Sequence, residues 1–322
     1  MPLFETLCVL ISLSTATVVL ASLTDLRGTT LTAPRNWALL ALACAALAEL
    51  APAVDLIRAQ SSLRILRYAS GILTFAPFMA LLGAKRPQNA AWQFVVLTLL
   101  IVLALPAGSS LVYGSRLAVP WMIAWLLWAL IGFEVITFLG TRLWPSAVGI
   151  AAAQVVGLHF ILPGTSWLAE SRTAALVAAI SGGLIPAVQV MLVSSKPSVD
   201  GEKSLRRMWA NFRALFGATW SLRVMMMFND AAERNHWPLR LGWSGCEIAP
   251  AAETKEQNSV TTQTSAKSPV DPQVLRGMEK GLRMLLRRFV SPAWVEARWD
   301  GTWPVEQGEL PPISRKKAEP IK

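Results

Sequence analysis

Long apolar runs separated by short polar stretches fill the chain up to Lys196. A helix of about 20 apolar residues is long enough to cross a hydrocarbon core of ~30 Å. The pattern therefore predicts an all-α fold that begins with a polytopic membrane helix bundle of about seven spans. The expected spans are Leu3–Leu23, Asn36–Leu56, Tyr68–Leu82, Trp92–Tyr113, Leu117–Leu139, Trp144–Leu162 and Thr173–Val193.

Basic residues around the spans indicate how the chain is threaded. The leading residues "MPLFE" carry no positive charge, whereas Arg27 and Arg35 follow the first span, so that span is expected to be an anchor with its N-terminus outside. The expected location is the cell's inner (cytoplasmic) membrane. An odd number of spans then places the C-terminus in the cytoplasm, as the positive-inside tendency expects for a basic tail. The short loops do not favour either orientation, so the basic tail decides it. The loop residues expected inside are Arg27, Arg35, Lys85, Arg86 and Arg142, and those expected outside are Arg58, Arg64, Arg67, Arg116 and Arg172.

The pattern changes in residues 196–249, where apolar residues recur at helical spacing between charged ones. Arg213 and Arg223 argue against an eighth span. We expect an amphipathic helix from Lys203 to about Asn235 that lies along the inner membrane surface, with a bend near Gly217 and a tight turn at "LGWSG". Its apolar stripe contains Leu205, Met208, Trp209, Phe212, Leu215, Phe216, Trp220, Val224, Met227 and Phe228.

Three further segments complete the expected organisation after the transmembrane bundle, residues 1–195. Residues 250–271 are polar and poor in large apolar side chains, which predicts a disordered linker. Residues 272–308 hold a second basic amphipathic helix, from about Pro272 to Val290, and a Trp-rich segment. Residues 309–322 form a basic tail.

Composition agrees with a membrane protein and suggests its partners. The mean hydropathy is +0.44, and 53% of residues are hydrophobic against 16% charged. A net charge of +10 would suggest nucleic acid in a soluble protein, but here anionic lipid headgroups, or a membrane-protein partner, explain it better, and no nucleic acid is expected. The side chains expected to contact lipid are Arg206, Arg207, Arg213, Arg283, Arg287 and Arg288.

The sequence contains few residues or motifs that could bind a metal or a cofactor. Cys8, Cys44 and Cys246 show no paired spacing, and His159 and His236 are the only histidines. This excludes a centre built from several histidines, and we expect no metal and no cofactor. No Gly-rich phosphate loop or Gly-x-Ser-x-Gly elbow occurs in the chain.

One stretch, "FNDAAERNHWPLR", gathers side chains that are useful in catalysis. The Glu-x-x-His spacing within it places both side chains on one face of a helix, as in di-iron carboxylate bundles, which however need two such motifs. The alternative is that the stretch is the hydrated end of the long amphipathic helix, which Trp237–Pro238 terminates. The sequence favours a helix end and leaves catalysis open, with the candidates Asn229, Asp230, Glu233 and His236.

Polar residues within the expected spans form a second set of candidates. Depth along the spans indicates that Glu49 and His159 meet near mid-membrane, and that Glu134 meets Gln189 near the inner face. These pairs either line a polar cavity for a proton, ion or headgroup, or only lock helices together. Locks of this kind contribute ~0.6–2 kcal/mol, and the sequence favours them.

A short stretch bears on lipid chemistry. "SLRRMW", Ser204 to Trp209, resembles the Ser-Leu-x-x-Phe-Trp stretch of wax synthases and related membrane-bound acyltransferases. The resemblance covers six residues, and this chain lacks both the Arg-Arg-Trp that should follow and a later intramembrane histidine. No activity is therefore transferred from that family.

Three functions are compatible with this sequence. The first is an accessory or structural membrane component whose basic cytoplasmic region binds lipids or a partner. The second is a lipid-modifying membrane enzyme of the acyl- or headgroup-transferase type. The third is a secondary transporter with a site at the Glu49–His159 level and a helix break at "SGGLIP", Ser181 to Pro186.

Overall fold

The structure, a computed structural model, is mostly helical. It describes residues 17, 26–53, 60–86, 88–114, 116–165, 205–248, 272–301 and 303. Two of the expected spans, Leu3–Leu23 apart from residue 17 and Thr173–Val193, lie outside the described residues. The same holds for the expected linker and basic tail, for Gln189 and for the "SGGLIP" break.

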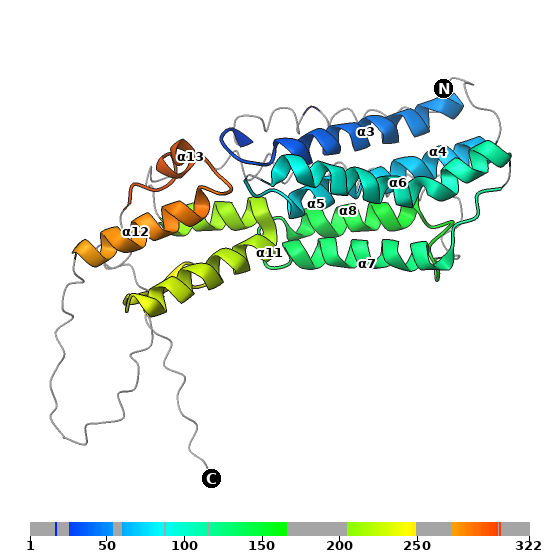
Figure 1. The fold of residues 1–322 in the computed structure, drawn as a ribbon. Coiled ribbons are helices and arrows are strands. Elements are labelled where there is room, and N and C mark those ends of the chain that lie inside the picture. The colour runs from blue at the N-terminus through cyan, green and yellow to red at the C-terminus, as the bar shows by residue number, and fades with distance from the viewer. Residues whose placement is uncertain are drawn as a thin grey trace, which may run out of the picture.

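A bundle of roughly parallel and antiparallel helices forms the first part of the molecule (Figure 1). Large side chains from successive helices interlock at its centre, where Tyr68, Phe75 and Leu127 are fully buried. The hydroxyl of Tyr68 donates a hydrogen bond to the Leu103 carbonyl at 2.6 Å, so this buried polar group is satisfied. The bundle helices are α3 (Thr32–Ala53), α4 (Gln60–Leu73), α5 (Ala76–Leu82), α6 (Asn89–Tyr113), α7 (Trp121–Phe138) and α8 (Trp144–Gly157).

Within the described residues, three helices are long and apolar enough to cross a membrane: Ser61–Leu82, Ala90–Tyr113 and Trp121–Phe138. They correspond to the third, fourth and fifth expected spans. Large apolar side chains cover the outer faces of Ala90–Tyr113 and Trp121–Phe138, with Phe94 75% exposed and Trp121 72% exposed. An outer surface of this kind is stable in lipid and unfavourable in water, which indicates a membrane-associated protein.

Helix α11 (Leu205–Arg234) is two helical arms that reverse direction at Gly217 (φ 71°, ψ −176°). Trp209 Nε1 donates to the Gly242 carbonyl at 3.0 Å, and Asn229 Nδ2 donates to the neighbouring Leu241 carbonyl, also at 3.0 Å. In a straight helix residues 209 and 229 would be roughly 30 Å apart, so both bonds require the second arm to fold back along the first. The bend expected near Gly217 is therefore a full reversal.

Aromatic side chains of both arms pack against the segment that follows helix α12 (Pro272–Leu286). The Phe289 ring lies 5.6 Å from the Phe212 ring and 5.0 Å from the Trp220 ring, centre to centre. Each aromatic contact of this kind adds about 0.5–1.5 kcal/mol to the effect of apolar burial. A short helix, α13 (Pro292–Glu296), places Trp294 in the same core.

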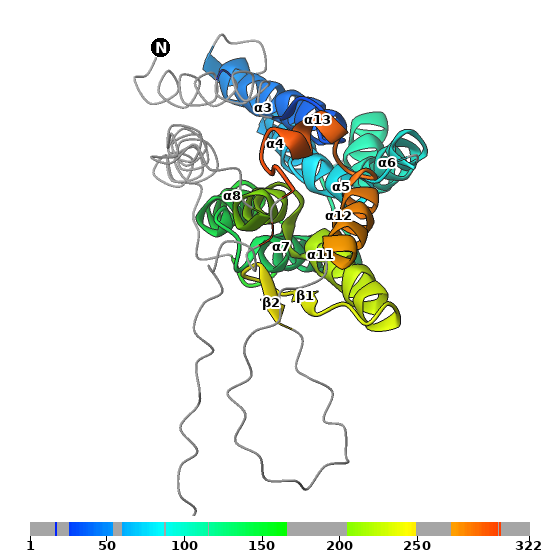
Figure 2. The same cartoon turned by 90° about the vertical axis from the view of Figure 1, so that its left-hand side faces the viewer.

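This packing corrects the expectation that the long amphipathic helix, now α11, rests its apolar face on the membrane. Met278 and Leu282 of α12 are fully buried, as are Phe212 and Phe228 of α11. All four belong to one protein core. The apolar faces of α11 and α12 cover each other, and the two helices extend beyond one end of the bundle (Figure 1). Figure 2, viewed from that end, shows α12 beside α11.

The "LGWSG" turn joins two short antiparallel strands, β1 (Leu239–Leu241) and β2 (Cys246–Ile248). The Gly242 amide closes the turn by donating to the Gly245 carbonyl at 2.6 Å. Alternation in β1 buries Leu239 and leaves Arg240 exposed, so the hairpin covers one side of the α11 arms.

Backbone hydrogen bonds fasten this C-terminal assembly, α11 to α13 with the β-hairpin, to one end of the bundle. The Thr30 amide donates to the Phe289 carbonyl at 2.9 Å, and the Arg86 amide donates to the Arg288 carbonyl at 2.8 Å. Trp220 Nε1 donates to the Leu81 carbonyl at 3.0 Å. The end of the bundle and the assembly are thus joined at several positions.

Candidate functional site

The stretch that contains Asn229 is the end of the second α11 arm. The Asn229 side chain donates to the Leu241 carbonyl at 3.0 Å and accepts from the Leu241 amide at 2.8 Å. An amide side chain has one acceptor oxygen and one donor nitrogen, so it can satisfy the N–H and the C=O of one residue as a paired strand would. Asn229 therefore holds β1 against α11, a structural task that uses both ends of its side chain.

His236 terminates the helix. Its backbone is left-handed, with φ 52°, and the Trp237 amide donates to the Ala232 carbonyl at 2.8 Å. This is the Schellman pattern, in which the left-handed residue stands just past the last helical turn. Because α11 ends at Arg234, Glu233 and His236 do not share a helical face as their spacing had predicted.

Asp230, Glu233 and His236 are exposed. In the ranges that the structure describes, no group of three or more His, Cys, Asp and Glu side chains lies where it could hold a metal ion. The four candidate catalytic residues thus divide into Asn229, which is bonded to β1, and three side chains at the solvated end of the helix.

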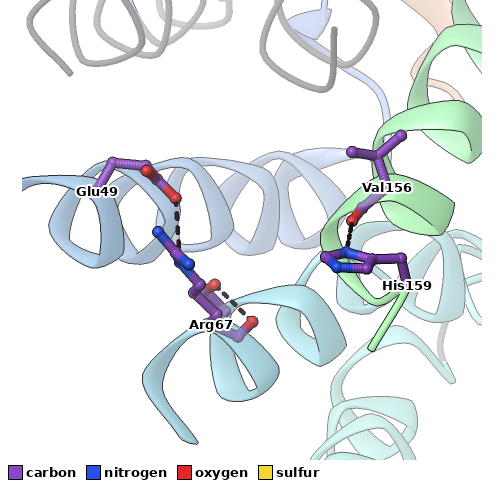
Figure 3. Close-up of polar contacts among 5 residues, drawn as sticks. Glu49, Arg67, Val156 and His159 are labelled. Atoms are coloured by element: carbon purple, nitrogen blue, oxygen red, sulfur yellow. Dashed lines mark hydrogen bonds and ion pairs between the residues drawn. The ribbon is translucent and has the colours of Figure 1, made fainter. Parts of the chain in front are cut away.

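The structure gives Glu49 and His159 different partners, as Figure 3 shows. The Glu49 carboxylate lies 3.7 Å from Arg67 Nε, between α3 and α4. His159 Nδ1 lies 2.7 Å from the Val156 carbonyl, within the turn that follows α8. In place of the expected Glu49–His159 pair, Glu49 therefore contacts a neighbouring helix, and His159 contacts its own turn.

Glu134 has a buried partner on a neighbouring helix. The Gln154 side-chain amide on α8 donates to the Glu134 carboxylate on α7 at 3.0 Å, and both side chains are buried. The expected partner, Gln189, lies outside the described residues. A buried polar pair between two apolar helices is an arrangement that locks their relative rotation.

Arg213 and Arg283, which were expected to contact lipid, are bonded within the protein. Arg213 donates to the Trp243 carbonyl and stacks over the Trp243 ring at 4.2 Å. Burial, with the positive charge of nearby Arg142, lowers the pKa of Arg213. Arg283 pairs with Glu279 at 2.7 Å and lies 5.2 Å above the Trp299 ring. The exposed members of the set are Arg206, Arg207, Arg287 and Arg288.

Lys85, Arg223 and Arg288 surround a shallow depression where the C-terminal assembly meets the bundle. Lys85 and Arg223 were not among the lipid-contacting residues expected from the sequence. For Lys85, its position directly after an expected span could have indicated contact with lipid headgroups. Arg223 carried no such signal, because only the reversal at Gly217 brings it to the end of the bundle.

Cys246 is buried in β2. Burial, together with the negative charge of Glu247, raises the pKa of its thiol to about 12. A thiol with so high a pKa stays protonated near neutral pH, and a protonated thiol is a poor nucleophile and metal ligand. Cys246 therefore acts as a small apolar side chain of the core.

These features define the class: a helical, membrane-associated protein with a bundle and an attached C-terminal helical assembly. Comparison of the chain with models of known families, with curated proteins and with solved structures finds no match. The function is therefore argued from the geometry alone.

Proposed function

We propose that the protein is an accessory component of the inner membrane with seven spans, whose C-terminal assembly stands in the cytoplasm and binds anionic lipids or a partner subunit. The observation that carries the proposal is the distribution of side chains in that assembly. Aromatic rings fill its interior, while Arg206, Arg287 and Arg288 lie exposed on its surface. A basic surface beside a membrane attracts anionic headgroups.

The threading is supported by the end of the bundle to which the assembly is attached. Three connections of the bundle, at Gly28, Arg86 and Gly140, bond to the assembly. These connections carry the basic residues expected on the cytoplasmic side, such as Lys85 and Arg142. The short loops at the two ends hold equal numbers of basic residues, so it is the basic assembly at this end that agrees with the positive-inside tendency.

An enzyme centred on Asn229 and His236 is a weaker proposal. Catalysis requires side chains that converge on one reacting atom. Asn229 is occupied by the backbone of Leu241, and His236 is the exposed residue that ends α11. The accessory function therefore accounts for more of the observed contacts than lipid chemistry at this cluster does.

Whole-cell lipid profiling tests the accessory function against the enzyme. Three strains are compared: one without the protein, one that overproduces it, and one that overproduces a Glu233→Ala/His236→Ala form at equal membrane abundance. We expect no lipid class to depend on the two side chains. A lipid class that rises with the intact protein but not with the double variant would overturn the accessory function and establish lipid chemistry at the end of α11.

Lipid binding itself is tested on the purified full-length protein in detergent. We expect phosphatidylglycerol, which is anionic, to raise the Tm more than phosphatidylcholine does, because a ligand that binds the folded state stabilises it. Equal increases with both lipids would contradict anionic-lipid binding. The proposal would then depend on a partner subunit.

A further inference from the structure

Three positive side chains from three separate segments converge on one shallow depression. Lys85 comes from the connection between α5 and α6, Arg223 from the second arm of α11, and Arg288 from the segment after α12. The reversal at Gly217 and the bond between the Arg86 amide and the Arg288 carbonyl bring the segments together. The other residues that line the depression are Trp220, Val224, Met227, Leu285 and Phe289.

The depression lies at the level where a span leaves the membrane. Lys85 follows directly after Ser61–Leu82, one of the helices long and apolar enough to cross a bilayer. Trp220, on the depression floor, donates to the carbonyl of Leu81 at the end of the same helix. Lipid phosphates occupy this level, just outside the hydrocarbon core.

The three cations have no counter-ion in the described part of the chain. No carboxylate lines the depression, and the ion pairs of Glu49 with Arg67 and of Glu279 with Arg283 involve none of the three cations. Like charges that gather at a partly enclosed surface repel one another, and an anion that binds between them offsets this repulsion.

Exposed apolar side chains on the bundle side of the cations distinguish a lipid from a soluble anion. Helix α6 begins at Asn89, shortly after Lys85, and its first turns expose Phe94 and Val95. A phosphate bound at the depression, with acyl chains that run along the bundle, matches this order of charged and apolar positions.

We propose that Lys85, Arg223 and Arg288 bind the phosphate of an anionic phospholipid in the cytoplasmic leaflet, with its acyl chains directed along the bundle. The inference rests on the function proposed above, because it requires the assembly to stand on the cytoplasmic side of the membrane. It deepens that function by naming the ligand class and the residues that bind it.

The test uses the full-length protein in detergent, with the Tm followed as phosphatidylglycerol is added. Lys85→Gln/Arg223→Gln/Arg288→Gln is expected to need roughly 100-fold more lipid for the same increase, since each cation near a membrane contributes several-fold to binding. The matched control, Arg240→Gln/Arg276→Gln/Lys280→Gln, removes the same charge at exposed positions outside the depression. It is expected to respond as the unmodified protein does.

Each other outcome has a definite meaning. Equal loss in both triple variants would overturn the site and leave general charge attraction. No increase in Tm with the unmodified protein would overturn anionic-lipid binding as a whole. Inorganic phosphate that stabilises the protein as much as the lipid does would overturn the lipid and favour a soluble anion.

A conservative variant keeps the test valid if removal of three charges prevents folding. Arg223→Lys/Arg288→Lys keeps the charges and is expected to keep lipid binding within about tenfold, because a lysine binds phosphate as a point charge. Arg223→Gln alone changes one exposed side chain and is expected to weaken binding several-fold. An unchanged lipid response in a folded Arg223→Gln variant would contradict the assigned site.

Discussion

The bundle and the C-terminal assembly orient their tryptophans in opposite directions. Trp121 and Trp125 of the bundle are 72% and 56% exposed, whereas Trp209 and Trp299 of the assembly are fully buried. Both arrangements keep indole rings away from water, with lipid as the surroundings in one region and protein in the other. An apolar helix face therefore indicates that something covers it, without indicating whether that is lipid or protein.

The largest expected effect comes from breaking the joint between the two regions. Gly217→Ala would place a Cβ 2.7 Å from Thr137 Cγ2 and 2.9 Å from the Thr137 carbonyl, at a backbone conformation that only glycine readily adopts. We expect the free energy of unfolding to fall by roughly 2–6 kcal/mol, from backbone strain and overpacking together. Tryptophan fluorescence during denaturant unfolding of the full-length protein measures the change.

The control for this variant is Gly277→Ala in α12. A Cβ at Gly277 would lie 3.9 Å from the Trp237 ring, an ordinary contact, within regular helix. Alanine is a better helix former than glycine by ~1 kcal/mol, so the control is expected to keep or slightly raise stability. Equal stability of the Gly217→Ala and Gly277→Ala variants would show that the reversal does not hold the assembly on the bundle.

The next effect concerns the polar contact that holds the β-hairpin on the aromatic core. Asn229→Ala removes both hydrogen bonds to Leu241, whose backbone groups then lose their partner at a residue that is 1% exposed. We expect a loss of about 2–4 kcal/mol, since each unsatisfied buried group costs ~1–3 kcal/mol. Denaturant unfolding of the variant gives the value.

Asp230→Ala is the matched control at the next position. Its side chain is exposed, and substitutions at such sites usually change stability by less than about 0.5 kcal/mol. The difference between the two variants tests the structural task of Asn229. Similar small effects at both positions would contradict it and return Asn229 to the list of catalytic candidates.

The two regions also differ in how far the sequence predicts them. In the bundle, the apolar runs located Ala90–Tyr113 and Trp121–Phe138 to within a few residues, because a span is defined by its own length and composition. In the assembly, the same kind of pattern located the stripes of α11 and α12 but not what covers them. A stripe that faces lipid and a stripe that faces another helix have the same spacing.

Polar pairing was harder to predict than helix position. Depth in the membrane made Gln189 an expected partner of Glu134, and that pairing stays a prediction because Gln189 lies outside the described residues. Depth does not specify which helices are neighbours, so it did not suggest Gln154, which the structure pairs with Glu134. At the end of α11, the spacing of Glu233 and His236 assumed a continuous helix. The helix instead ends at Arg234, and His236, with its left-handed backbone, lies just beyond it.

A smaller effect is expected from the polar pair inside the apolar bundle. A double-mutant cycle with Glu134→Gln and Gln154→Leu is expected to give a coupling energy of ~0.6–2 kcal/mol, the range for hydrogen bonds between membrane helices. Unfolding of all four forms in one detergent provides the cycle, in which each single variant serves as a control. A coupling energy near zero would mean that the two side chains do not lock α7 to α8.

The smallest effect has the opposite sign and tests the exposed end of α11. His236→Gly is expected to raise the free energy of unfolding by about 0.5–1 kcal/mol, because glycine adopts a φ of 52° without the strain of a side chain. Asn235→Gly is the matched control: among described non-glycine residues only His236 has positive φ, so glycine at the neighbouring position relieves no strain and is expected to lower stability slightly. If His236→Gly destabilised the protein as much as Asn235→Gly does, then ending the helix would not be the only contribution of His236 to stability. A contact made by its imidazole ring would then have to be sought at the membrane surface.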